Sequence, residues 1–275
     1  AQIAYDEDFL PILSGSVAYA AMSRVADSLG SSTARIRFAI RTNAYDGGLF
    51  ERRNMYYSAA DVGQVAVTEL LQAVNLIVTN AEQESDIIDV NVDVELNGER
   101  QTALLVSATP DKMTVKPGET VTFRTKIRPY RKAEETLSIS YQVPKTQPAG
   151  VLNLDIRGGG FVPVNPLMLF AQAGLEVPDD EEKFKSTGDR LRELAEQGEN
   201  NEIIIAPGAA PAPTSEKEMK KRMKAAAKAS ARAAKEEPEK RVKLLADPNK
   251  KEAKEKFFAP YVIENVIHAT LKVEE

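Results

Sequence analysis

The chain contains no cysteine and no tryptophan, and it has a single histidine, His268. The missing cysteines exclude thiol nucleophiles, disulfide bonds and cysteine-ligated metal sites. One histidine leaves almost no material for a Ser-His-Asp triad or for a metal site built from several histidines. Aromatic residues make up only 6% of the chain, which argues against a binder of nucleic acid or carbohydrate that works by stacking.

Long apolar runs and a strong charge of one sign are also missing. No run reaches the roughly 18 apolar residues of a transmembrane segment, and Ala1-Gln2-Ile3 lacks the basic start of a signal peptide. The net charge of −5 predicts no general field for binding phosphates. What is present is 275 residues, 43% of them hydrophobic, which is enough for one large domain or two ordinary ones.

The first part of the chain, residues 1–85, has the pattern of a small α/β domain. Apolar residues recur at helical spacing over 9–29 and again over 59–80, with Ser58 as the expected cap of the second helix. Between them, 33–42 alternates between apolar and basic residues, as a half-buried strand does. An Asp-Gly-Gly turn separates it from a second strand. We therefore expect two helices and an antiparallel sheet.

From residue 86 the period of the pattern changes to two, and short strands follow one another with Pro/Gly turns. Asn97-Gly98 is a strong hairpin signal. This spacing is typical of an antiparallel sandwich, so an Ig-like β-sandwich is expected over 86–164, closed by a last strand over 258–275. The expected core positions of the sandwich are Val121, Phe123, Ile127, Ile139, Tyr141, Val151 and Leu154.

Residues 165–257 interrupt this sandwich as a long insertion of helical or disordered character. It includes a Pro/Ala linker over 206–214, and residues 215–256 carry 15 basic and 8 acidic side chains. Spacing of four residues along a Lys/Ala helix makes four cations the candidate partner-contact residues: Lys220, Lys224, Lys228 and Arg232. They could touch an acidic partner, an anionic membrane surface or a cell-wall polymer, or they could form a solvated arm. The helix lacks a broad apolar face, which disfavours membrane contact.

The side chains that could carry chemistry each have a simpler explanation. His268 lies in a strand-like run and needs a nucleophile within hydrogen-bond reach to act as a base. Ser14 and Ser16 lie in an apolar helix without the glycine spacing of a nucleophile elbow. The acidic row Asp89, Asp93 and Glu95 fits a solvated strand face that guards against aggregation. We expect no catalytic residue, no cofactor and no metal site.

Three stretches resemble the C-terminal region of SpoIVB-type serine peptidase proteins: RRNMYYSAADVGQVAVTELLQAVNLIVTN, TALLVSATPDKMTVKPGETVTFRTKIRPYR and ISYQVPKTQPAGVLNLDIRGGG. The resemblance covers about residues 10–164, and weakly the closing YVIENVIHATLKV. In such proteins the catalytic part lies N-terminal, and its serine and histidine motifs have no counterpart here. The resemblance therefore implies a non-catalytic region at the bacterial cell envelope, outside the cytoplasm.

Two functions follow as expectations. The first is a binding or assembly module that contacts a protein partner, either its own peptidase domain or further copies of itself. The alternative is a structural envelope protein that forms a homo-oligomer or lattice. In neither case do we expect nucleic acid to be a partner. The sequence leaves open the partner, the substrate of any attached peptidase, the oligomeric state, and whether the chain is a mature protein or a processed fragment.

Overall fold

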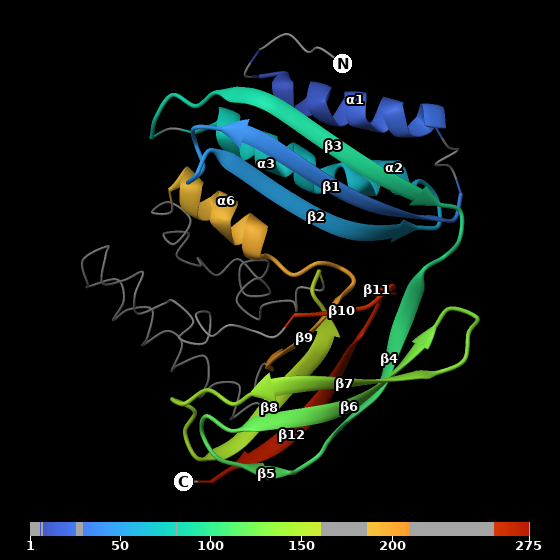
Figure 1. The fold of residues 1–275 in the computed structure, drawn as a ribbon, viewed down its shortest axis with the longest axis vertical. Helices are drawn as coiled ribbons and strands as arrows, with labels where there is room; N and C mark the ends of the chain where they lie inside the picture. Colours follow the sequence, from blue (N-terminus) through green and yellow to red (C-terminus); the bar gives the residue numbers. More distant parts are fainter. Residues whose placement is uncertain are drawn as a thin grey trace, which may run out of the picture.

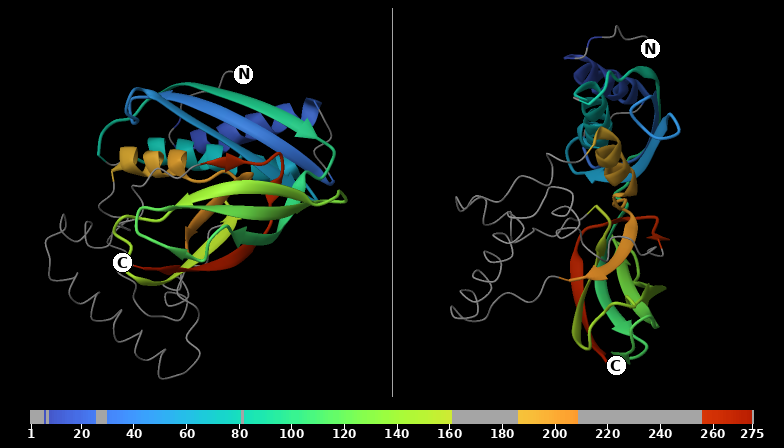
Figure 2. Two further views of the ribbon diagram at one scale, coloured as in Figure 1. Left: turned by 60° about the horizontal axis from the view of Figure 1, so that its bottom comes forward. Right: turned by 90° about the vertical axis from the view of Figure 1, so that its left-hand side faces the viewer.

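The computed structural model describes residues 6, 8–25, 30–80, 82–160, 186–208 and 256–274. These residues form two units, each with its own hydrophobic core (Figure 1). The first unit holds a three-stranded sheet with helices on one face, and the second holds a five-stranded and a four-stranded sheet. The fold is mixed α+β, as the sequence predicted, and Figure 2 shows the two units from two further sides.

The sheet of the first unit is antiparallel. Its strands, in spatial order, are β2 (Leu49–Ser58), β1 (Ser32–Thr42) and β3 (Ile87–Asn97). The predicted alternation is confirmed in β1, where Ile36 and Phe38 are at most 2% exposed while Arg37 and Arg41 are exposed. Successive side chains of a strand point to opposite faces. The sheet thus has an apolar face against the helices and a charged face, which we call the open face.

Helices α1 (Leu10–Val25), α2 (Val62–Ala66) and α3 (Thr68–Val78) cover the apolar face (Figure 1). The sequence predicted one helix over 59–80, whereas the structure has two helical segments that meet at Val67. Asp61, rather than Ser58, caps α2, because its side chain accepts the backbone N–H groups of Gly63 and Gln64. The Ser58 hydroxyl instead accepts from the loop residues before the helix.

Strand β3 corrects the predicted boundary between the two parts. The sequence placed 86–97 in the sandwich, as the first arm of a hairpin turning at Asn97-Gly98. The structure pairs β3 with β1, so it belongs to the first unit. The reason is long-range complementarity: Val92 and its apolar neighbours extend the helix-facing core, and Glu95 lies opposite Arg35. This outweighs the local turn signal.

The second unit consists of two sheets. The first, in spatial order, is β10 (Phe257–Phe258), β9 (Glu202–Pro207), β8 (Gly150–Gly158), β12 (Val266–Val273) and β5 (Thr114–Val115). The second is β11 (Val262–Ile263), β4 (Thr102–Pro110), β6 (Thr120–Pro129) and β7 (Glu135–Gln142). Most pairings are antiparallel, but β5 pairs with β12 and β11 with β4 in parallel. The C-terminal strand β12 joins this unit beside β8, where the sequence placed a closing strand.

The predicted core of the second unit is largely confirmed. Five of the expected residues are at most 3% exposed: Val121, Phe123, Ile127, Ile139 and Leu154. Tyr141 is only partly buried. The prediction that Val151 is a core residue is wrong, since this side chain is 70% exposed. It lies three residues from Leu154 on the same strand, and an odd separation places two side chains on opposite faces.

The described part of the predicted insertion belongs to both units. Helix α6 (Thr187–Glu196) packs Leu191 and Leu194 into the core of the first unit. Strand β9 then pairs with β8 and places Ile203 in the core of the second. The helical character expected for the insertion 165–257 agrees with α6, whereas strand β9 and the packing of these two elements into the two cores were not expected.

Candidate functional site

A buried ion pair of the first unit lies where this unit meets the loop that leads to the second. Arg52 of β2 has a side chain only 3% exposed, and it binds the carboxylate of Glu69 on α3 through Nε (2.8 Å) and Nη2 (3.1 Å). Its remaining contacts reach the loop after α6, where Nη1 donates to the carbonyl of Gln197 and Nη2 to that of Gly198. A buried charge must be paired and hydrogen-bonded. Arg52 therefore ties this loop to the first sheet.

Asn54, two residues along β2, extends this contact into the second unit. Its Nδ2 donates to the Glu69 carboxylate (2.7 Å), and its Oδ1 accepts the backbone N–H of Asn200 (2.7 Å). The Asn200 side chain donates to the carbonyl of Met55 (2.9 Å) and so contacts β2 at this point. Burial raises the pKa of the Tyr56 hydroxyl, and the nearby Glu69 carboxylate raises it further. The four side chains Arg52, Glu69, Asn54 and Asn200 are called the junction network below.

A second contact between the units forms around Arg100, in the connection from β3 to β4. The Arg100 guanidinium binds both carboxylate oxygens of Glu264 at 2.9 Å, and this hydrogen bonding raises the pKa of Arg100. The same guanidinium lies over the rings of Tyr57 (4.8 Å) and Tyr130 (4.3 Å). Since Tyr57 belongs to β2 and Tyr130 follows β6, this contact adds to the orientation set by the junction network.

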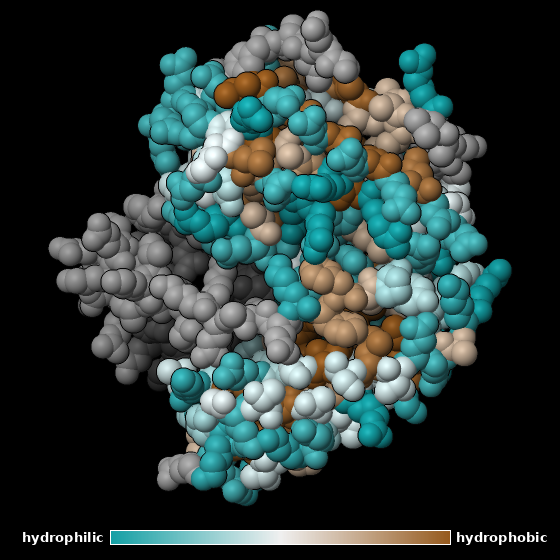
Figure 3. All heavy atoms as spheres, in the orientation of Figure 1, coloured by the Kyte–Doolittle hydropathy of each residue, from teal (hydrophilic) through white to brown (hydrophobic). Residues whose placement is uncertain are grey.

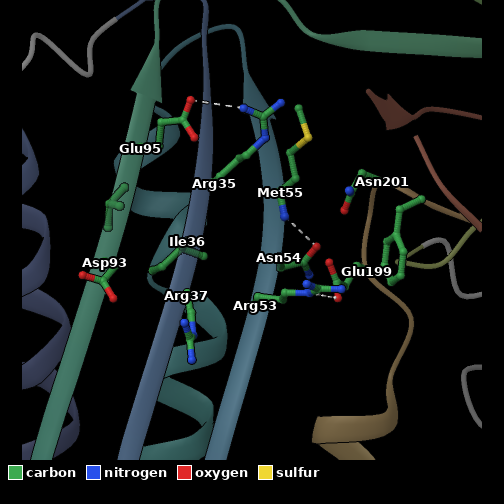
Figure 4. Close-up of a pocket in the computed structure, with 12 residues that line it drawn as sticks. Arg35, Ile36, Arg37, Arg53, Asn54, Met55, Asp93, Glu95, Glu199 and Asn201 are labelled. Carbon is green, nitrogen blue, oxygen red and sulfur yellow. Dashed lines mark hydrogen bonds and ion pairs between the residues drawn. The ribbon is translucent and has the colours of Figure 1, made fainter. Parts of the chain in front are cut away.

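An open pocket of about 610 Å³ lies between the open face of the first sheet and the loop that follows α6 (Figure 4). β1, β2 and β3 supply most of its lining, and Glu199, Asn201 and Phe258 come from the second unit. Its charged lining residues are Arg35, Arg37, Arg53, Asp93, Glu95 and Glu199. The pocket thus combines equal numbers of cationic and anionic side chains with an aromatic ring.

The arginines of the pocket are held by carboxylates but keep donors available. Arg53 Nε binds Glu199 Oε1 at 2.7 Å, and the guanidinium lies 4.8 Å from the centre of the Phe258 ring. Arg35 binds Glu95 at 3.2 Å. Arg37 pairs with Glu51 at 2.8 Å, which raises the pKa of the Arg37 guanidinium. Each of these ion pairs uses one guanidinium nitrogen, and a guanidinium has five N–H donors.

The chemistry of this lining suits binding. The described lining includes no Ser, Thr, Cys, Lys or His, and its carboxylates Asp93, Glu95 and Glu199 lie among three arginines. In the described ranges no group of three or more His, Asp or Glu residues could hold a metal ion. Arginine donors, carboxylate acceptors and a partly exposed ring can bind backbone amides and charged side chains of a polypeptide.

His268, the one histidine, lies away from this pocket on β12. Its Nδ1 is 2.8 Å from Oδ1 of Asp155 on the neighbouring strand β8, and the imidazole is 73% exposed. Thr270, two residues on, donates its hydroxyl to Asn153. The structure thus gives His268 a carboxylate partner, but no described contact joins it to a hydroxyl nucleophile.

The other candidates from the sequence do not converge on a site. Ser14 is buried in α1 and Ser16 is exposed on the same helix. The row Asp89, Asp93 and Glu95 lies on the open face along β3, as the alternation predicted. The four candidate partner-contact residues Lys220, Lys224, Lys228 and Arg232 lie outside the described residues.

The pocket was missed by sequence reasoning because its two sides are far apart in the chain. Glu199 and Asn201 follow β2 by about 145 residues, in a stretch that was assigned to the insertion. The alternating arginines of β1 were the one available signal, since a row of cations on a half-buried strand needs acceptors nearby.

In the part of the chain that the structure describes, no helix is long and apolar enough to cross a membrane. No protein-family model, no curated protein and no solved structure matches the chain.

Proposed function

We propose that this chain is a non-catalytic protein-binding and assembly module. We also propose that the pocket between the open face and the loop after α6, called the junction pocket below, holds a polypeptide segment of a partner. The observation that carries the proposal is the pocket itself, with its mixed arginine and carboxylate lining beside Phe258. The junction network and the Arg100 contact support it, because they orient the two walls of the pocket before a partner arrives. A preorganised site avoids part of the entropic cost of binding.

The setting of this module rests on the resemblance to SpoIVB-type peptidase proteins. We propose that it works at the bacterial cell envelope, beside a peptidase domain that lies N-terminal in such proteins. We also propose an Ig-like relationship for the second unit. Two sheets around one core support this, whereas the parallel pairings of β5 and β11 depart from a purely antiparallel sandwich.

Peptide binding should depend on Arg37, which lines the pocket, and not on Arg41, which lies outside it. Peptides selected from a displayed random library against the immobilised chain are expected to bind Arg37→Ala about tenfold more weakly, because arginines dominate such contacts. Arg41→Ala is the matched control, since Arg41 is exposed on the same face of β1 but does not line the pocket. Fluorescence anisotropy measures both. Equal losses for the two variants would assign the binding to general charge.

The purified chain is expected to show no serine-peptidase activity. A fluorophosphonate probe should label no serine stoichiometrically, and casein turnover should stay at the level of buffer. The reason is that Ser14 is buried in a helix and that His268 has no described hydroxyl partner. Stoichiometric labelling at any serine, mapped by mass spectrometry, would reject the non-catalytic assignment.

A homo-oligomer is the second candidate, and the outward face of α1 favours it. Four large apolar side chains of this segment are between 36% and 62% exposed: Phe9, Ile12, Leu13 and Val17. A helix that is apolar on both sides usually has a partner on each. Sedimentation velocity over a range of concentrations distinguishes the candidates, since a module for other proteins should remain monomeric.

A further inference from the structure

Strand β3 forms the outer edge of the first sheet (Figure 1). It is 11 residues long, and within the described ranges none of its backbone groups forms a hydrogen bond beyond β1. Half of the N–H and C=O groups of an edge strand point away from the sheet. The opposite edge differs at one point, because the Asn200 side chain donates to the Met55 carbonyl of β2 there. At the β3 edge, no such contact is present within the described ranges.

The apolar side of β3 is also incompletely covered. Ile36, Phe38 and Ile40 of the neighbouring strand β1 are at most 2% exposed. On β3, Val90, Val92, Val94 and Leu96 are only partly buried. In Figure 3, drawn in the orientation of Figure 1, hydrophobic residues gather along the upper margin of the first unit, above a hydrophilic centre. A further strand beside β3 would continue the helix-facing core outward.

The open side of β3 is acidic, and this limits which strand can be added. Asp89, Asp93 and Glu95 lie opposite Arg41, Arg37 and Arg35 of β1. An antiparallel pairing of β3 with β3 of a second copy would bring the two acidic rows together on the same face. Like charges directly opposite destabilise a sheet. A strand with basic residues on this face and apolar residues on the other would complement both rows.

We propose that the outer edge of β3 binds an extended segment of a partner protein by strand addition, and that this segment alternates basic and apolar residues. The inference rests on the proposed binding function and assigns it a second surface and a partner pattern. β1 already shows the fit: its Arg-Ile-Arg-Phe run pairs with the inner edge of the same strand. Main-chain hydrogen bonds supply the affinity of such complexes, and the alternating side chains supply the selectivity.

The sequence of β1 therefore provides the probe. A synthetic peptide with the sequence Ser32–Thr42, fluorescently labelled, is expected to bind the full chain in an anisotropy titration. A control peptide with glutamate at its three arginine positions keeps the apolar row and should bind about tenfold more weakly or worse. Salt should weaken the first complex, because exposed ion pairs are screened. Equal affinity for both peptides, or no binding of either, would overturn the proposal.

Backbone pairing has its own signature. Two peptides are N-methylated at alternate residues, one on the even and one on the odd positions, so that each loses the donors of one edge. Only one of the two should bind, because an added strand uses one edge. Hydrogen exchange should slow in 87–97 and stay unchanged in 32–42. Equal binding of both peptides, or protection outside 87–97, would show that the backbone of β3 is not the site.

A pair of variants separates this surface from the junction pocket. Asp89→Lys changes an exposed residue that does not line the pocket, and it should weaken peptide binding about tenfold. Glu51→Lys makes the same charge change on the opposite edge strand and should have little effect. If library peptides bind through Arg37 while the β1 peptide fails, the edge proposal falls and the proposed function stands. If the β1 peptide binds and no Arg37-dependent peptide is found, the reverse holds.

Discussion

Replacing Phe123 by alanine is expected to lower the free energy of unfolding by about 3–5 kcal/mol. Phe123 lies on β6, opposite Ile139 of β7, and none of its surface is exposed. The truncation removes a large apolar side chain from water-free surroundings and leaves a cavity that close-packed neighbours fill only in part. Urea unfolding followed by circular dichroism measures the loss.

Phe9→Ala is the matched control for this truncation. It makes the same chemical change at a residue that is 59% exposed, so the expected loss is about 0.5 kcal/mol or less. A loss below about 1 kcal/mol for Phe123→Ala would contradict the register of β6, because the side chain would then have to face solvent.

Arg52→Met is expected to cost about 3–5 kcal/mol of stability. Methionine keeps the apolar part of the side chain but leaves the Glu69 carboxylate without its cation, in a site where that carboxylate is only 13% exposed. It also removes the donors to the carbonyls of Gln197 and Gly198. Denaturant unfolding gives the magnitude.

Two further variants decide the cause of that loss. Arg37→Met breaks an ion pair whose partners are 64% and 49% exposed, and it should cost about 1 kcal/mol or less. Arg52→Met combined with Glu69→Leu removes both buried charges and should regain part of the stability. A double variant no more stable than Arg52→Met alone would show that the lost contacts to the loop, and not the unpaired carboxylate, dominate.

Local patterns in the sequence predicted most elements correctly, because each depends on its own residues. The alternation of Ile36, Arg37 and Phe38 specifies a strand with one buried face whatever its neighbours are. The turn at Pro117-Gly118 requires a positive φ, and Gly118 adopts 81° there. The core residues of β6 and β7 follow from the same periodicity. The prediction for Val151 was wrong because it assigned Val151 and Leu154 to the same face of β8.

Pairing between distant segments could not be predicted in the same way. β3 joins β1 across the intervening helices because its two rows complement those of β1, whereas the Asn97-Gly98 signal concerns only four residues. The junction pocket needs Glu199 beside Arg53, and their separation of 146 residues leaves no periodic trace. The helical pattern at α6 was visible in the sequence, but neither strand β9 nor the packing of these two elements on two different cores could be predicted from local composition.

The placement of α6 has a consequence for how this protein is made. Leu191 and Leu194 complete the core of the first unit, yet they leave the ribosome about 90 residues after β3 ends. The sheet of the second unit is completed later still, since β12 (Val266–Val273) pairs with β8. The segments of the two units therefore alternate along the chain. Neither unit can complete its core during synthesis before part of the other has been made. A continuous fragment ending after β3 would lack α6, which completes its core. The two units have separate cores, but no single cut in the sequence divides one from the other.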